Sequence, residues 1–261
     1  PFDYAVVDEA QDIAVAELRF LAALGGNRPN SLFFAGDLGQ RIFQQPFSWL
    51  SLGVDIRGRS RSLRVNYRTS HQIREQADRL LGAEISDVDG VTEERRGTIS
   101  VFDGPPPEIQ VLEDEAAEKA AVASWVKARV DEGFDPLEIA LFVRSDEEVD
   151  RAREAAAEAG LAVPVLTDAI EIQRGAVVVS TMHRAKGLEF RGVVVMACDD
   201  EVIPLQSRVE SVGDEADLEN VYETERHLLY VACTRARDRL LVTGVEPGSE
   251  FLEDLATGTV Q

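Results

Sequence analysis

Cysteine, histidine and long apolar runs are scarce in this sequence. Its 261 residues include two cysteines and three histidines. No metal-ligand spacing surrounds Cys198 or Cys233, which predicts two reduced, buried thiols in a cytoplasmic protein and excludes a disulfide framework. No apolar run approaches the roughly 20 residues that cross a bilayer. The opening residues carry no basic region and no cleavage site, which excludes a signal peptide there.

Positive charge is scarce as well. Lysine and arginine number 27 against 48 aspartates and glutamates, for a formal net charge of −21. This balance excludes a surface that attracts nucleic acid everywhere, so a nucleic acid needs a local groove of arginines and aromatic rings. The phosphate-binding loop Gly-x-x-x-x-Gly-Lys-Ser/Thr is also missing, because Gly25-Gly26 has no lysine and Lys186-Gly187 has the wrong order.

Short apolar runs alternate with segments of helical spacing along the whole chain. Two strands, at residues 4–7 and 31–35, flank a helix at 13–24. A later series has strands at 109–112, 139–143, 176–181, 193–197 and 240–243, and helices at 115–130, 146–159 and 218–234. Apolar strands separated by helices predict an α/β fold, with parallel sheets that are covered on both faces and that bind ligands at their carboxyl ends.

The composition divides the chain into three parts. We expect one α/β unit in residues 1–65, a connecting helix and linker in 66–107, and a second α/β unit in 108–261, with the run at 176–181 as a central strand. The linker is polar and holds the run Pro105-Pro106-Pro107. Residues 205–217 are acidic, which predicts a mobile loop.

An acidic pair, Asp8-Glu9, directly follows the first apolar strand. An aspartate in this place can hold Mg²⁺, and the adjacent glutamate can polarise water beside a γ-phosphate. Alone the pair is a weak signal, because acidic residues often end strands as solvated turns or helix caps.

Five segments in order along the chain strengthen that signal. With Gln11 and Asp12, the acidic pair resembles the Walker B box of superfamily 1 helicases. The later segments resemble the third to sixth helicase motifs: GDLGQRIF at 36–43, NYR at 66–68, TMHRAKGLEF at 181–190 and YVACTRA at 230–236. The chain therefore resembles the C-terminal part of the UvrD/Rep family of DNA helicases, whose motors are two RecA-like lobes.

This resemblance implies a site for ATP and Mg²⁺. In the family, the residues matching Asp8 and Glu9 serve the metal and activate the attacking water, and the residue matching Gln40 senses the γ-phosphate. Arg68 and Arg235 match two arginines that reach the γ-phosphate from the second lobe, where a guanidinium suits the charge of a transferring phosphoryl group. For each arginine, the alternative is a surface ion pair.

The resemblance also implies contacts around the rest of the nucleotide. Tyr67 matches the tyrosine that packs on the adenine, although a tyrosine is often simply part of a core. Glu189 matches a residue near the ribose, and Gly187 of the same motif is expected beside the nucleotide.

Four further residues are candidates for binding single-stranded DNA. The family places the residues matching Thr181 and His183 against the DNA backbone. Phe43 and Trp49 could stack on bases, because a ring face accepts any base. Trp49 departs from the family's spacing and can equally be a core residue.

The sequence departs from the family in two places. The family's phosphate-binding loop lies upstream of the Asp-Glu strand, so we expect an upstream part of the same polypeptide to supply it. The family's large helical insertion before the fifth motif is also missing, and residues 166–175 fill its place.

The resemblance predicts part of an ATP-dependent motor that moves 3′ to 5′ on single-stranded DNA. The alternatives are a degenerate helicase-like scaffold without ATPase activity, and another P-loop enzyme such as a transport ATPase. Intact Glu9, Gln40, Arg68 and Arg235 count against the scaffold, and the signature segments of transport ATPases are missing.

Overall fold

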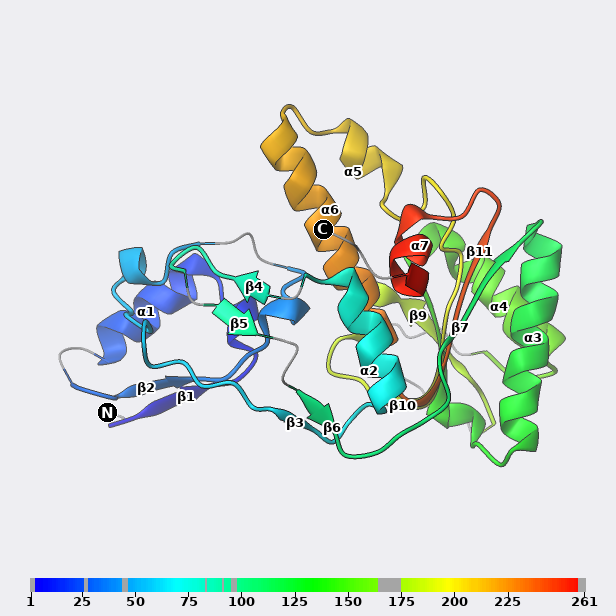
Figure 1. Ribbon diagram of the computed structural model, residues 1–261, viewed down its shortest axis with the longest axis horizontal. Helices are drawn as coiled ribbons and strands as arrows, with labels where there is room; N and C mark the ends of the chain where they lie inside the picture. Colours follow the sequence, from blue (N-terminus) through cyan, green and yellow to red (C-terminus); the bar gives the residue numbers. More distant parts are fainter. Residues whose placement is uncertain are drawn as a thin grey trace.

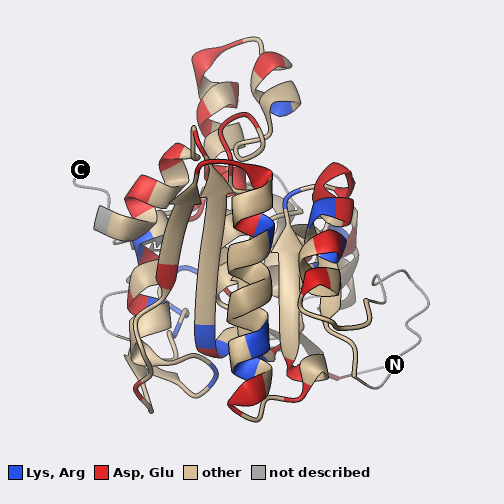
Figure 2. Ribbon diagram, turned by 90° about the vertical axis from the view of Figure 1, so that its right-hand side faces the viewer, with Lys and Arg blue, Asp and Glu red and all other residues tan. Residues whose placement is uncertain are grey.

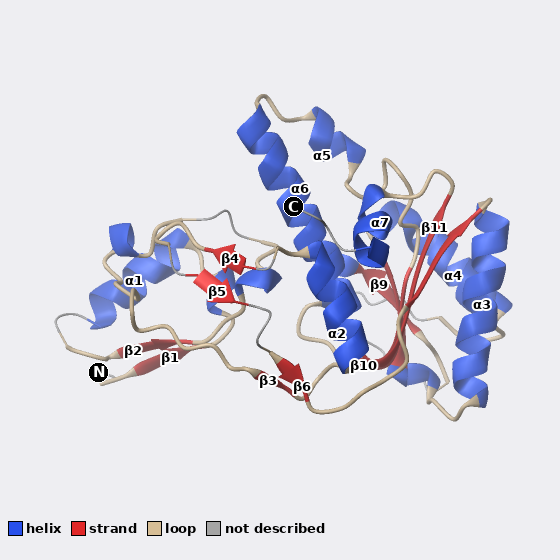
Figure 3. Ribbon diagram, viewed as in Figure 1, coloured by secondary structure: helices blue, strands red, loops and turns tan. Residues whose placement is uncertain are grey.

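The computed structural model describes residues 3–25, 28–43, 47–82, 84–90, 92–94, 98–163 and 175–257. Figure 1 shows two regions, a small one at the N-terminal end and a larger one built on a central sheet. Figure 3 shows helices on both faces of that central sheet. Within the described residues, no helix is both long enough and apolar enough to cross a membrane.

The N-terminal region is built on two short parallel strands. Strand β1 (Ala5–Val7) pairs with β2 (Leu32–Phe34), with Val6 opposite Phe33. Helix α1 (Val15–Gly25) packs on one face of the pair, where Leu18 is fully buried. Val6 and Phe33 point to the other face and are 74% and 63% exposed. One face of this sheet therefore lies open.

The larger region is a five-stranded parallel sheet in the order β7-β11-β10-β8-β9. Its strands are β7 (Glu108–Leu112), β8 (Ile139–Val143), β9 (Val178–Thr181), β10 (Phe190–Val195) and β11 (Ala236–Val245). Every residue of β8 is fully buried, as the continuous apolar run requires. The predicted α/β fold with a parallel sheet is confirmed.

Two layers of helices bury the faces of this sheet. Helices α3 (Glu115–Asp131) and α4 (Val149–Glu158) cover one face. Helices α2 (His71–Ala77), α6 (Glu215–Cys233) and α7 (Glu250–Thr257) cover the other. Alternate residues of one strand enter the two layers: Leu141 of β8 packs with α3 and α4, and Phe142 packs with α6. Aspartates cap α3 and α6, because Asp114 and Asp214 each accept a backbone N–H of the first turn.

The connecting residues dock onto the larger region. Strand β3 (Val65–Asn66) pairs in parallel with β6 (Ile99–Ser100), and the antiparallel pair β4 (Glu84–Ser86) and β5 (Thr92–Glu94) lies between them in the chain. The backbone N–H of Ser70 donates to the carbonyl oxygen of Arg237 at 3.1 Å. Helix α2 therefore belongs to the helical layer of the second sheet.

Two expectations from the sequence are wrong. The strand that was expected to be central, β9, lies at an edge of the described sheet, and its apolar run is buried because α4 and the residues after β9 pack on it. The acidic segment 205–217 is not a loop throughout, because it contains helix α5 (Gln206–Glu210) and the first turn of α6. Of residues 166–175, which were expected to fill the place of the family's insertion, 166–174 lie outside the described residues.

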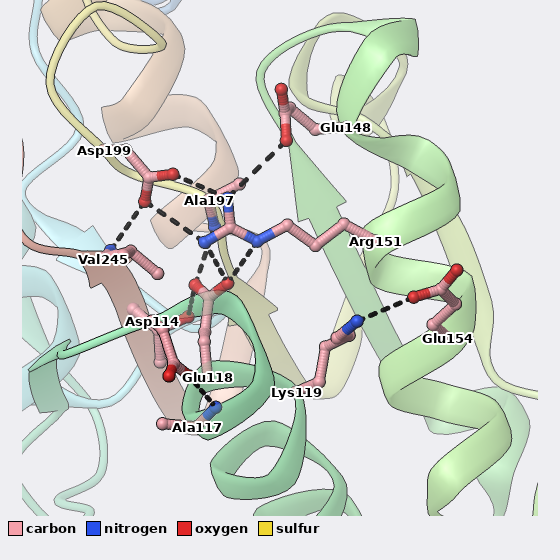
Figure 4. Close-up of polar contacts among 11 residues, drawn as sticks. Asp114, Ala117, Glu118, Lys119, Glu148, Arg151, Glu154, Ala197, Asp199 and Val245 are labelled. Carbon is pink, nitrogen blue, oxygen red and sulfur yellow. Dashed lines mark hydrogen bonds and ion pairs between the residues drawn. The ribbon is translucent and has the colours of Figure 1, made fainter.

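A buried polar network joins both helices of one layer to the sheet. The carboxylate of Glu118, in α3, is 0% exposed. It accepts from Arg151 Nε at 2.6 Å, from Thr243 Oγ1 at 2.6 Å and from the Ala197 N–H at 2.9 Å. Arg151, in α4, also donates to Asp199 at 2.6 Å (Figure 4). The network holds the segment after β10, where Ala197 has a φ of 56°.

Candidate nucleotide and nucleic-acid site

A cleft of about 590 Å³ lies where the two regions meet. Both regions and the connecting segment line it: Asp37, Gln40, Leu63, Val65, Asn66, Tyr67, Arg68, Thr69, Arg74, Thr98, Glu189, Tyr230, Thr234 and Arg235. Five of the predicted site residues therefore share one cleft, although they span residues 40 to 235.

The N-terminal region contributes a chain of side chains from the carboxyl ends of β1 and β2. Gln11 is buried and donates from Nε2 to the Glu9 carboxylate at 2.5 Å, while its Oε1 accepts the Asp37 N–H at 3.0 Å. Gln40 donates from Nε2 to Asp37 at 2.9 Å. Glu9 itself has left-handed backbone angles, φ 51° and ψ 41°, which cost energy in a residue other than glycine and often mark functional positions. Glu9 is thus linked to the cleft through Gln11 and Asp37.

Arg235 joins the two regions. Its Nη2 donates to Gln40 Oε1 at 3.2 Å, and its Nε donates to the Val231 carbonyl oxygen at 3.0 Å. The residue is 1% exposed, so the expected alternative of a surface ion pair is wrong for Arg235. It lies in the turn between α6 and β11, one residue beyond the C-cap of the helix.

The electrostatics of the cleft favour an anion. Burial lowers the pKa of the Arg235 guanidinium, and the positive charge of Arg68 lowers it further. Two guanidinium groups that repel each other gain from an anion placed between them. In the structure Arg68 pairs with the Glu189 carboxylate instead. Arg68 is therefore in an ion pair, but one that lines the cleft.

The two sheets present opposite edges to the cleft. Gln40 and Asp37 follow β2, at its carboxyl end. Glu189 and Arg235 directly precede β10 and β11, at the amino edge of the five-stranded sheet. The rule that ligands bind at carboxyl ends therefore applies to the first sheet alone. Tyr67 follows β3 in the connecting segment and is 74% exposed, so its ring is accessible from the cleft.

Lys186 is a site residue that the sequence reasoning missed. Its Nζ donates to Asp12 at 2.6 Å and to the Gln40 carbonyl oxygen at 2.8 Å, and lies 3.9 Å from Glu9. Its side chain is 9% exposed. Its position inside the same motif as His183 and Glu189 could have indicated that Lys186 lies at the site. In the sequence, Lys186-Gly187 was compared only with a phosphate-binding loop, which it does not match. Lys186 ties the second region to the acidic residues after β1.

Asp8 is exposed, and one of its carboxylate oxygens accepts the Glu9 N–H at 2.9 Å. Within the described parts of the chain, no three His, Cys, Asp or Glu residues gather as metal ligands. Mg²⁺ usually keeps several waters and takes one or two carboxylates together with substrate phosphates. The accessible carboxylate of Asp8 fits that pattern as one ligand of such a metal. The metal role of Asp8 stays a prediction.

Two of the predicted DNA-binding residues lie together. The Phe43 ring is 53% exposed and its centroid is 6.4 Å from that of His183, and Lys186 Nζ lies 5.7 Å from the Phe43 centroid. His183 belongs to a 3₁₀ helix (Met182–Ala185) that follows β9. Burial lowers the pKa of its imidazole. Thr181, the last residue of β9, is 7% exposed.

Trp49 lies elsewhere. Its ring packs edge-on against Phe34 at 5.0 Å and beside Phe47 at 6.0 Å, in the core of the N-terminal region. The structure therefore favours the core alternative for Trp49. Gly187, with a φ of 78°, follows Lys186 and is not among the residues that line the cleft.

Positive charge is confined to small groups. Figure 2 shows acidic residues over the helices and over the loops around one end of the sheet, with lysines and arginines in separate patches. This agrees with a local rather than a general attraction for nucleic acid.

Comparison with known proteins extends this description. Residues 165–246 match the protein family described as the UvrD-like helicase C-terminal domain. The chain is 30% identical over 165 residues to the ATP-dependent DNA helicase UvrD2 of Mycobacterium tuberculosis (strain H37Rv), covering 61% of this chain and 23% of that protein. It is 48% identical over 65 residues to YjcD of Bacillus subtilis (strain 168), covering 24% of this chain and 8% of that protein.

A solved structure shows the same fold. It is the C-terminal domain of a possible DNA helicase from Lactobacillus plantarum WCFS1, with a TM-score of 0.50 and 23% identity, over 73% of this chain and 94% of that one. Over residues 165–246 the chain is therefore similar to the UvrD-like helicase C-terminal domain, and over a longer stretch it is distantly similar to UvrD-family DNA helicases. Its matches span less than a quarter of the length of the curated relatives.

Proposed function

We propose that residues 1–261 form part of an ATP-dependent motor that translocates 3′ to 5′ on single-stranded DNA and unwinds duplexes. The observation that carries this proposal is the hydrogen bond between Gln40 and Arg235. It joins a residue after the first sheet to a residue before the last strand of the second, across a cleft that two arginines make favourable for an anion.

In this proposal ATP occupies the cleft between the two regions. Tyr67 stacks on the base, Glu189 lies near the ribose, and Arg68 and Arg235 bind the γ-phosphate. Binding of ATP releases Arg68 from Glu189, because a bidentate contact with a phosphate replaces the ion pair. Arg235 needs little movement, because Val231 and Gln40 already orient its guanidinium.

Glu9 is the proposed general base. Its carboxylate takes the proton of the water that attacks the γ-phosphorus, as the bond between that phosphorus and the ADP oxygen breaks. Mg²⁺, held by Asp8 and the phosphates, supplies charge neutralisation when bound. Lys186 contacts Glu9, Asp12 and the Gln40 carbonyl oxygen. These contacts support a physical connection between the proposed base and the segment around His183, which is proposed to bind DNA.

In this proposal, residues outside 1–261 supply the phosphate-binding loop, because the sequence of residues 1–261 contains no Gly-x-x-x-x-Gly-Lys-Ser/Thr segment. The open face of β1 and β2 supports this part of the proposal. Parallel sheets occur almost only with both faces covered, and a two-stranded sheet is marginal by itself. Val6 and Phe33 lie on that open face, where further strands and helices of a first lobe can pack.

Steady-state ATP hydrolysis tests the proposal in two steps. The 261-residue chain alone should hydrolyse no more ATP than its Glu9→Gln variant. A polypeptide in which a phosphate-binding loop precedes these residues should hydrolyse ATP, and single-stranded DNA should stimulate it. Glu9→Gln in that longer polypeptide should abolish turnover.

Strand displacement on tailed duplexes tests the direction of movement. Duplexes with a 3′ tail should be unwound in the presence of ATP. Unwinding from 5′ tails alone would contradict the direction, and DNA binding without any ATP turnover in the longer polypeptide would support the scaffold alternative instead.

A further inference from the structure

A buried glutamate in the middle of α6 holds two arginines from different elements. Glu225 is 0% exposed. Arg144, directly after β8, donates from Nε and Nη2 to its two oxygens at 2.5 and 2.6 Å. Arg208, in α5, donates from Nη1 to Oε1 at 2.7 Å. One carboxylate thus orients two guanidinium groups and leaves one positive charge uncompensated.

The two arginines differ in how much of each is left for a ligand. The Arg144 side chain is 5% exposed and donates two hydrogen bonds to Glu225, from Nε and Nη2. The Arg208 side chain is 35% exposed. Within the part of the chain that the structure describes, Glu225 is the one side chain that binds the Arg208 guanidinium. Nε and Nη2 of Arg208 therefore keep their hydrogen-bonding capacity.

This group lies beside the segment that carries His183. The 3₁₀ helix Met182–Ala185 packs against α6 and β8. Burial is the main cause that lowers the pKa of His183; the positive charges of Arg144 and Arg208 lower it further, while Glu225 raises it. The Phe43 ring also lies near the imidazole, with the two ring centroids 6.4 Å apart. Asp146, the other acid that acts on His183, is 3.8 Å from Arg184.

We propose that Arg208, oriented by Glu225, binds a phosphate of the single strand that passes Phe43 and His183. Arg144 and Glu225 are positioning residues, since Arg144 neutralises the glutamate and leaves the charge of Arg208 for the ligand. The inference rests on the proposed binding of single-stranded DNA. It adds a DNA contact from α5, which lies outside the segments that resemble helicase motifs.

The chemistry of the surroundings favours a nucleic-acid phosphate over a carboxylate partner. Grooves for single strands combine cationic groups along the backbone with rings on which bases stack. A guanidinium with two free donors matches two oxygens of one phosphate. The chain has a net charge of −21, so cationic groups are few. The buried Glu225 carboxylate binds two arginines and thereby holds the positive charge of Arg208 in a fixed position.

Binding of a fluorescent oligothymidylate to the 261-residue chain, measured over a series of salt concentrations, tests this inference. Arg208→Gln should weaken binding at low salt and make the slope of log K against log salt less negative by about 0.7, the value for one phosphate contact on a single strand. Arg208→Lys should keep a slope close to that of the unchanged protein. Arg153→Gln is the matched control, because Arg153 is an exposed arginine of α4 paired with Asp150 at 3.2 Å.

Two further measurements distinguish the outcomes. The NMR titration of His183 should shift to a higher pKa in Arg208→Gln and stay unchanged in Arg153→Gln. Inorganic phosphate at matched ionic strength should not displace the oligonucleotide; if it does, the site takes free phosphate and the inference is wrong. Equal slopes for Arg208→Gln and the unchanged protein, or an equal loss in Arg153→Gln, would overturn it as well. Failure of the unchanged chain to bind the oligonucleotide would instead overturn the proposed DNA binding.

Discussion

The two sheets of this protein are both parallel, yet they are buried very differently. In the five-stranded sheet, β8 is fully buried and helices cover both faces. In the β1–β2 pair, Val7 and Phe34 pack on α1 while Val6 and Phe33 on the opposite face are exposed. The C-terminal region has a complete core of its own, whereas the N-terminal region has a small core on one side only.

The candidate site nevertheless needs both regions. The N-terminal region supplies Glu9 and Gln40 from strand ends of the less buried sheet, and the C-terminal region supplies Arg235 and Lys186 from its well-buried framework. The difference teaches that Glu9 and Gln40 of the proposed motor come from the region with the smaller core, and Arg235 from the region with the larger one.

Replacement of Arg235 should have the largest effect. In a polypeptide that supplies the phosphate-binding loop, Arg235→Ala should lower ATP turnover by about 10³–10⁵, the range for arginine fingers, while ATP affinity falls far less. ATPase rates and nucleotide affinities measured side by side check this. Arg237→Ala, two residues further on and exposed, should turn over ATP normally. Circular dichroism melting shows whether the buried Arg235 is needed for folding; near-normal turnover in Arg235→Ala would contradict its catalytic role.

Matched phenylalanine truncations should separate the two sheets. Phe142, in β8, is fully buried and packs edge-on against Phe190, with centroids 5.9 Å apart. Phe142→Ala should lower the free energy of unfolding by about 3–5 kcal/mol, the usual cost for a core phenylalanine. Phe33→Ala, on the open face of β2, should change it by at most about 0.5 kcal/mol. Urea unfolding measures both. A cost of several kcal/mol at Phe33 would mean that something covers this face in solution.

Replacement of Phe43, which lies beside His183 of the other region, should have a smaller effect, on the affinity for single-stranded DNA. If its exposed ring stacks on a base beside His183, Phe43→Ala should weaken binding of single-stranded DNA by about 1–3 kcal/mol. Fluorescence anisotropy with the 261-residue chain measures this. Trp49→Phe is the control, because Trp49 packs in the N-terminal core and a ring that preserves the packing should leave the affinity unchanged. Equal affinities for Phe43→Ala and the unchanged protein would make Phe43 a structural residue.

The smallest expected effect is a dependence of the free energy of unfolding on pH, caused by His183 in the C-terminal region. Burial lowers the pKa of His183 below its value in the unfolded chain, about 6.5. As the pH falls, the unfolded chain therefore binds this proton first. The contribution of His183 to the free energy of unfolding should be complete above about pH 6.5 and decrease below it. Urea unfolding as a function of pH should show that decrease reduced in His183→Gln and retained in His71→Gln, whose histidine is exposed.

Local patterns in the sequence predicted most of the strands and helices of the five-stranded sheet, but not α5, α7 or the β4–β5 pair. The apolar run 139–143 and the helical spacing of 115–130 gave a strand and a helix within one residue of those observed. Strand order was less accessible, because a continuous apolar run indicates burial on both faces and is the same in a central strand and in a covered edge strand such as β9. The acidic segment 205–217 was misassigned because its charges concealed a short helix whose Arg208 turns inward to Glu225.

By itself, the sequence determined the class of fold and named the motif residues that are candidates for the site, because both depend on residue type and short-range spacing. The tertiary structure alone decided which of those residues meet. Gln40 and Arg235 are separated by 195 residues and share a hydrogen bond because α6 and the turn after β2 pack together. Trp49 packs in the core of the N-terminal region, Lys186 contacts Asp12, and opposite edges of the two sheets face one cleft. Contacts of that kind depend on how whole elements pack, and short-range patterns carry no information about them.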